Sequence, residues 1–184
     1  MTTVFIGGSR AISRLNQLIR EELDDLIRRG CTIFVGDANG ADKAVQQHLA
    51  DRGYQNVIVY CMDDCRNNVG GWVARRVSLP GAKKDFAYYA SKDLAMAQDA
   101  RCGVMLWDGK SKGTLNNIQN LIAAGKKTLV YFRPTAAFYK LSSEQGLHEL
   151  LQRCNKGQIQ QAQRGLTNKL SLPGRQLSLQ DSHT

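Results

Sequence analysis

Residues 31–42 read Cys-Thr-Ile-Phe-Val-Gly-Asp-Ala-Asn-Gly-Ala-Asp, an apolar run that ends in a turn bracketed by two glycines. The run at residues 31–35 predicts a strand buried on both faces, because its apolar residues are continuous rather than alternating. The polar turn at residues 36–42 leads into a helical pattern that continues to about residue 52. A strand, a short turn and a helix together form the repeating unit of a parallel sheet.

The same unit recurs on both sides of this stretch. Further strands are expected at residues 4–6, 57–61, 103–107 and 128–132, and further helices at residues 12–27, 85–99 and 115–124. Such alternation implies right-handed crossovers. The sequence therefore predicts an α/β fold with a doubly wound parallel sheet of about five strands and helices on both faces.

The chain of 184 residues has the size of one domain. We expect a core domain at residues 1–134, a helix packed on or beside it at residues 135–154, and a polar, basic, flexible tail at residues 155–184. Residues 63–84 show no regular pattern and predict a basic loop, in which Trp72 is a candidate for stacking on a base.

The composition and charge of the chain limit the classes of binding partner that we expect. No apolar run approaches the ~20 residues that cross a bilayer, and the first residues carry no secretory signal, so we expect a cytoplasmic, bacterial protein without a membrane partner. The net charge of +9 favours polyanions, which could be nucleic acid or nucleotide phosphates.

Five cysteines are scattered along the chain, and we interpret them as structural thiols. Cys61 and Cys65 stand close in sequence, but no second Cys or His pair follows at zinc spacing. We therefore expect no metal and no cofactor.

Three glycine-containing turns follow three different strands, and in a parallel sheet they lie along one edge, where ligands of open α/β folds bind. The first turn leaves room for backbone to approach a phosphate. The middle turn either caps its helix or offers hydrogen bonds to ribose hydroxyls or a base edge. The third starts a helix and forms an anion cradle, to which Lys110 and Lys112 add positive potential. The expected ligand-binding residues of the three turns are Gly7, Gly8, Ser9 and Arg10; Gly36, Asp37, Asn39, Gly40, Ala41 and Asp42; and Asp108, Gly109, Ser111, Gly113 and Thr114.

The three turns, in this order and at these separations, resemble those of the SLOG superfamily, whose YspA-like branch has a Gly-x-x-x-Gly-Ala-Asp turn entering a helix. The superfamily is related to the Lonely Guy phosphoribohydrolases and the DNA-processing Smf family. The resemblance covers about residues 3–133 and implies a Rossmann-like nucleotide-binding fold. It also implies a phosphate at Ser111, Gly113 and Thr114, a sugar or base near residues 36–42, and a homodimer.

One departure bears on chemistry. The related hydrolases carry a catalytic Glu about three residues after the Gly-Thr threonine, where this chain has Asn117, which we also expect to contact the ligand. An amide cannot act as nucleophile or general base. Asp37, Asp42 and Asp93 are the remaining catalytic candidates.

Three functional hypotheses follow. The first is a nucleotide-binding or sensing module, which the missing Glu favours. The alternative is an N-glycosidase, or phosphoribohydrolase, acting on a nucleoside monophosphate through one of the aspartates. The second alternative is nucleic-acid binding through the basic loop and tail.

Overall fold

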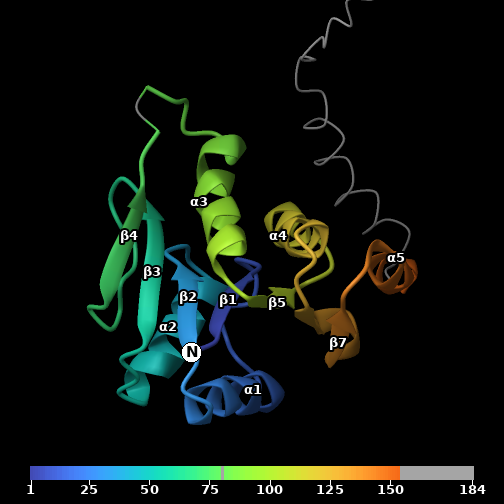
Figure 1. Cartoon of the computed structure of the whole chain (residues 1–184). Helices are drawn as coiled ribbons and strands as arrows, with labels where there is room; N and C mark the ends of the chain where they lie inside the picture. Colours follow the sequence, from blue (N-terminus) through green and yellow to red (C-terminus); the bar gives the residue numbers. More distant parts are fainter. Residues whose placement is uncertain (80, 154–184) are drawn as a thin grey trace, which may run out of the picture.

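The computed structural model describes residues 1–79 and 81–153, which form a seven-stranded sheet between two layers of helices (Figure 1). The tail expected at residues 155–184 lies outside the described residues. The strands are β1 (Thr3–Gly8), β2 (Thr32–Gly36), β3 (Val57–Met62), β4 (Val73–Val77), β5 (Cys102–Trp107), β6 (Thr128–Phe132) and β7 (Ala137–Leu141). The helices are α1 (Gln17–Arg28), α2 (Ala41–Asp51), α3 (Phe86–Asp99), α4 (Lys112–Ala123), α5 (Glu144–Gln152) and the 3₁₀ turn η1 (Arg133–Thr135).

The sheet has the strand order β4-β3-β2-β1-β5-β6-β7. All neighbouring strands are parallel except β6 and β7, which are antiparallel. The chain builds outward from β1 in one direction and then returns to place β5 on the other side of β1. This reversal of strand order makes the carboxyl ends of β1 and β5 the switch point of the fold, where a crevice forms between diverging loops.

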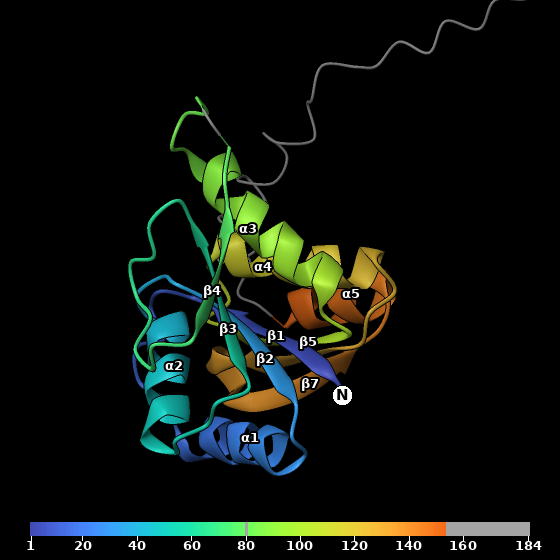
Figure 2. The ribbon, with the colours of Figure 1, turned by 60° about the vertical axis from the view of Figure 1, so that its left-hand side comes forward.

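Helices cover the sheet on both faces, as Figure 2 shows from a second side. On one face, α1 and α2 bury apolar residues such as Leu23 and Val45 against the β1–β3 strands. On the other, α3, α4 and α5 bury residues such as Met96, Ile118 and Leu147. The predicted α/β class and doubly wound, Rossmann-like arrangement are confirmed.

Two strands, β4 and β7, were not predicted from the sequence, and both lie at the edges of the sheet. β4 falls in the stretch expected to be an irregular loop, and its side chains are mostly exposed, with Arg75 and Arg76 in the middle. β7 and α5 both fall within residues 135–154, where only a helix was expected. Edge strands bury less of their surface, so neither shows the continuous apolar run that marks a central strand.

Glycine is required where two elements meet at the switch point. A side chain at Gly8 would collide with the backbone of Leu106 on β5 and with Ala41 at the start of α2. Gly40 has a φ of 84° and lies against the backbone of Arg10, so a larger residue is excluded both by conformation and by space. The turns after β1 and β2 are thereby packed directly on one another.

Two expectations about the stretch at residues 61–72 were wrong. Cys61 and Cys65 form a disulfide that closes the turn after β3, rather than remaining thiols. Trp72 is buried in the core, and its indole N–H donates to the carbonyl of Tyr54 at 2.8 Å, so it does not offer a stacking surface. Within residues 1–79 and 81–153, no helix is long and apolar enough to span a membrane.

Candidate functional site

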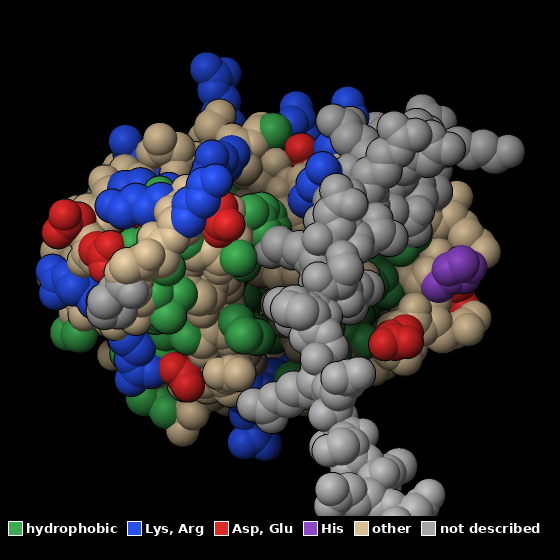
Figure 3. Space-filling model, turned by 90° about the horizontal axis from the view of Figure 1, so that it is seen from above, with side chains coloured by type: hydrophobic (Ala, Val, Ile, Leu, Met, Phe, Trp, Pro, Cys, Tyr) green, Lys and Arg blue, Asp and Glu red, His purple; other side chains and the backbone are tan. Residues whose placement is uncertain are grey.

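A cleft of about 510 Å³ lies at the carboxyl ends of β1 and β5, at the switch point of the sheet. Its walls come from the loop after β1, the first turn of α4, and the face of α3 that carries Phe86, Tyr89 and Asp93. Figure 3 looks onto this edge of the molecule from above, and on its left-hand side Lys and Arg side chains, with Asp and Glu among them, surround an apolar area. The cleft therefore lies where the fold itself leaves a crevice.

The start of α4 forms the outer end of the cleft and is organised by its own side chains. Ser111 caps the helix, because its hydroxyl accepts hydrogen bonds from the amide (3.3 Å) and the hydroxyl (3.0 Å) of Thr114. Asp108 accepts from the amides of Lys110 and Ser111 at 3.0 and 2.8 Å, which fixes the turn before the helix. The positive end of the helix dipole therefore faces this end of the cleft, which Lys110 also lines, and this arrangement suits an anion.

The loop after β1 is fixed to both neighbours through Ser9. Its amide donates to the Leu106 carbonyl of β5 at 2.9 Å, and its carbonyl accepts from the amide of Ala41 on α2 at 3.2 Å. Its buried hydroxyl accepts from the amide of Ala11 at 3.1 Å. The loop thus presents Gly7, Gly8 and the exposed Arg10 to the cleft from a preorganised position.

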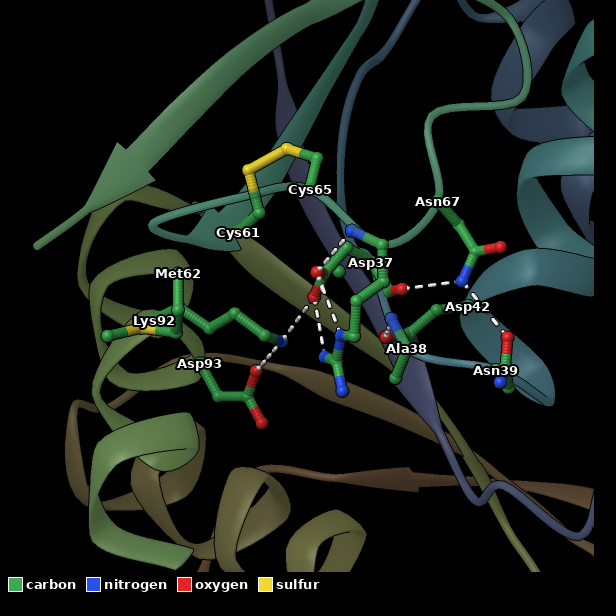
Figure 4. A network of polar contacts seen from close by, with 12 residues as sticks. Asp37, Ala38, Asn39, Asp42, Cys61, Met62, Cys65, Asn67, Lys92 and Asp93 are labelled. Atoms are coloured by element: carbon green, nitrogen blue, oxygen red, sulfur yellow. Dashed lines mark hydrogen bonds and ion pairs between the residues drawn. A yellow bond between two sulfur atoms is a disulfide. The ribbon is translucent and has the colours of Figure 1, made fainter. Parts of the chain in front are cut away.

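The inner end of the cleft is built on a buried cation, Lys92 of α3, whose side chain is only 4% exposed. Its ammonium donates to Asp93 Oδ1 at 2.6 Å and lies 3.8 Å from Asp37 Oδ1 (Figure 4). Burial opposes the charged form of Lys92, but the carboxylates of Asp93, Asp42 and Asp37 outweigh that cost and raise the pKa of the ammonium. Lys92 is therefore paired with Asp93 and Asp37 and is attracted to the nearby Asp42.

The carboxyl group of Asp42 has a strongly raised pKa. Its burial raises its pKa from 3.8 to about 7, aided by repulsion from Asp93 and Asp37, while Lys92 and the amide of Ala38 act in the opposite direction. Its Oδ2 accepts from the Ala38 amide at 3.2 Å. Near neutral pH, Asp42 is therefore divided between its protonated and ionised forms.

Asp37 is buried, does not line the cleft, and fixes a second loop. Its carboxylate accepts two side-chain hydrogen bonds from Arg66, at 2.7 and 3.0 Å, and one from the Arg66 amide at 3.1 Å. Burial works against ionisation, but these bonds and Lys92 outweigh it and lower the pKa of Asp37. Asn67 extends the link by donating to the Asp37 carbonyl (2.7 Å) and to Asn39 Oδ1 (3.1 Å), as Figure 4 shows. The guanidinium of Arg66, held by Asp37, lies over the ring of Tyr89, 5.1 Å from its centroid, and Arg66 lines the cleft.

Asn117 and Asp93 meet across the packed helices α4 and α3. The amide nitrogen of Asn117 donates to Asp93 Oδ2 at 3.1 Å, while Asp93 Oδ1 accepts from Lys92. Asn117 is 5% exposed, and its Oδ1 accepts no hydrogen bond within the described part of the chain. Both side chains line the cleft.

The predicted site residues divide into two groups. Eleven line the cleft: Gly7, Gly8, Ser9, Arg10, Asp42, Asp93, Asp108, Ser111, Gly113, Thr114 and Asn117. Six support it without lining it: Gly36, Asp37, Asn39, Gly40, Ala41 and Gly109. The expected role of the middle turn therefore shifts, because most of its residues hold the cleft wall and only Ala38 and Asp42 line the cleft.

Sequence reasoning missed Lys92, Arg66 and the aromatic side chains of α3. Lys92 falls four residues after Tyr88 and four before Met96, within the buried stripe of α3. A lysine at such a position signals a buried charge, so this residue could have been found. Arg66 could not, because its partner Asp37 is 29 residues away in the chain.

Among residues 1–79 and 81–153, no group of three or more His, Cys, Asp or Glu side chains could hold a metal ion. Of the carboxylates in and beside the cleft, Asp93 is paired with Lys92, and Asp37 is paired with Lys92 and Arg66.

No protein-family model matches the sequence, and no curated protein sequence matches it. A solved structure of DNA processing protein A from Helicobacter pylori, described for its single-stranded DNA binding mode, is similar in fold. It has a TM-score of 0.54 and 17% sequence identity, and the match covers 91% of this chain and 80% of that chain. The likeness supports the Rossmann-like architecture, the feature that the sequence, the strand order and this solved structure have in common.

Proposed function

We propose that the protein binds a nucleotide or nucleotide-derived ligand in the cleft at the switch point, as a sensing or binding module. The observation that carries the proposal is the polarity of the cleft. Its outer end offers the first turn of α4 with Ser111 and Lys110, and its inner end offers the buried side chains of Lys92 and Asn117 beside the partly exposed carboxylate of Asp93. A ligand with an anionic end and a hydroxyl-rich end matches both.

Size and aromatic surface agree with such a ligand. A volume of about 510 Å³ lies within the range of small-molecule sites. Phe86 and Tyr89 of α3 line the same cleft and supply flat apolar surface for a base.

Gly113 provides a direct test. A side chain added there meets no atom within 4 Å, and an acidic residue in the first turn of a helix favours the helix. Gly113→Asp should therefore fold, yet repel a phosphate at the outer end. Two like charges about 5 Å apart at an effective dielectric constant near 20 repel by about 3 kcal/mol, which is more than tenfold in affinity.

The measurement is calorimetric titration of the wild-type protein with nucleoside mono-, di- and triphosphates. Gly113→Asn is the matched control, because it has the same shape without the charge. The proposal predicts binding by the wild type, a more than tenfold loss in Gly113→Asp, and a much smaller loss in Gly113→Asn. It fails if no nucleotide binds, or if both variants lose affinity equally.

A second candidate is N-glycosidic hydrolysis of a nucleoside monophosphate, and the position of Asp93 favours it. Asn117 stands where the related hydrolases carry Glu, but Asp93 places a carboxylate 3.1 Å from the amide nitrogen of that side chain, on the cleft wall. A carboxylate can serve as base or nucleophile where an amide cannot. Chromatographic detection of free base from nucleoside monophosphates, lost in Asp93→Asn, would support hydrolysis, and nucleotide binding without base release would remove it.

A third candidate, single-stranded nucleic-acid binding, draws support from the described activity of the similar solved structure and from the net charge of +9. It predicts that affinity for an oligonucleotide falls steeply with salt. An absence of any oligonucleotide shift at low salt would exclude it.

A further inference from the structure

The side-chain amide of Asn117 is held in one orientation at the inner end of the cleft. Its nitrogen donates to Asp93 Oδ2 at 3.1 Å, and Asp93 is itself held by Lys92 at 2.6 Å through its other oxygen. Rotating the amide by half a turn would bring two oxygens together at Asp93 and lose this bond. The carbonyl oxygen of Asn117 is therefore fixed on the side away from Asp93.

That carbonyl oxygen is buried and lacks a donor. Asn117 is 5% exposed, and its Oδ1 is the one buried side-chain polar atom without a hydrogen-bond partner in the described part of the chain. A buried acceptor left unsatisfied costs about 1–3 kcal/mol. Asn117 lines the cleft, so a ligand group that reaches its carbonyl oxygen supplies the missing donor and recovers that cost.

Position along α4 indicates which ligand group reaches this oxygen. Asn117 follows Gly113 by four residues, which is about one helical turn or 6 Å along the axis. With a phosphate at the first turn of α4, the sugar of a nucleotide lies at that depth and the base edge lies farther on. Asp93 adjoins the same point with carboxylate oxygens, which also accept and do not donate.

We propose that the cleft selects a ribose over a deoxyribose, with the fixed carbonyl oxygen of Asn117 accepting a hydrogen bond from a sugar hydroxyl. This inference rests on the proposed nucleotide binding and names the sugar that the site takes. Asn117 is the selecting residue, and Asp93 is a positioning residue that acts by orienting the amide. A deoxyribose that lacks the hydroxyl facing Asn117 leaves the acceptor empty, as it is without ligand.

The discriminating measurement compares affinities for AMP, GMP, CMP and UMP with those for their 2′-deoxy and 3′-deoxy counterparts, by calorimetric titration of the full chain. Loss of one hydrogen bond to a buried acceptor corresponds to about a tenfold difference. The wild type should prefer the ribonucleotide over at least one deoxy counterpart by that factor. In Asn117→Ala the preference should fall to about one, because the ribonucleotide loses its acceptor.

Two further variants guard against a folding defect. Asp93→Asn keeps Asn117 but removes the carboxylate that orients it, so the preference should fall here too. Asn120→Ala changes the same residue type one turn later on α4, outside the cleft, and should keep the wild-type preference. Thermal unfolding of all three variants checks that they are folded.

The outcomes separate this inference from the proposal beneath it. Nucleotide binding without any preference between ribose and deoxyribose overturns the sugar selection and leaves the proposed function standing. A preference that persists in Asn117→Ala overturns the role of Asn117. No binding of any nucleotide overturns both.

Discussion

The burial of Asp42 predicts how the free energy of unfolding of this protein depends on pH. In the unfolded chain its pKa is near 3.8, and in the folded protein burial raises it to about 7. Between these values the folded state binds a proton that the unfolded state does not, so stability falls as pH rises through this window. A difference of about 3 pKa units at 1.36 kcal/mol each corresponds to about 4 kcal/mol, lost by pH 7–8.

The perturbation that tests this is Asp42→Asn, which keeps the shape and an acceptor for the amide of Ala38 but cannot ionise. Urea unfolding at half-unit steps from pH 4 to pH 8 should show similar stability for variant and wild type near pH 4. As the pH rises, the free energy of unfolding of the variant should exceed that of the wild type by about 1.4 kcal/mol more for each pH unit, reaching about 4 kcal/mol at pH 8. Asp51→Asn, at the exposed end of the same helix, is the control and should follow the wild type throughout. Parallel profiles for wild type and Asp42→Asn would refute the reasoning.

Two more predictions concern the backbone around the site. Gly40→Ala should destabilise the protein by more than about 2 kcal/mol in urea unfolding, because its φ is 84° and its added methyl would collide with neighbouring backbone. Gly125→Ala, with a φ of 68° and open space, should cost only about 1 kcal/mol, and equal losses would contradict the steric argument. Cys65→Ser should lower stability by about 2 kcal/mol, because it opens the short loop that the bond to Cys61 closes. Adding a thiol reductant should bring the wild type to the level of the variant, and a wild type that ignores the reductant would count against the disulfide.

Much of the fold could be predicted from local patterns, since the central strands are continuous apolar runs and the helices carry one apolar stripe. β1, β2, β3, β5 and β6 were expected in this way, each within a few residues of its observed bounds. β4 and β7 gave no such signal, because an edge strand has one unpaired side and little buried surface. Their place in the sheet depends on neighbours that are distant in sequence.

The candidate site was predictable to the extent that it depends on turns. The glycines after β1 and before α4 indicated the edge of the sheet and the residues that line the cleft there. The role of a carboxylate was not predictable, because Asp37 and Asp42 are equivalent by pattern. The difference depends on Arg66, which is 29 residues from Asp37 in the chain and binds its carboxylate. Asp37 therefore supports the cleft wall, whereas Asp42 lines the cleft.

The charges around the cleft bear on how a nucleotide would be oriented. Lys92 and Arg66 are cationic, and Asp37 and Asp93 balance them when Asp42 carries its proton. The inner end is then neutral, and it becomes negative as pH rises through about 7 and Asp42 ionises. A phosphate gains nothing at a neutral or negative surface, whereas the dipole of α4 attracts it at every pH in this range. We therefore infer that an anionic ligand enters with its hydroxyl-rich end toward Asn117 and its phosphate toward the first turn of α4, and that its affinity declines as Asp42 loses its proton.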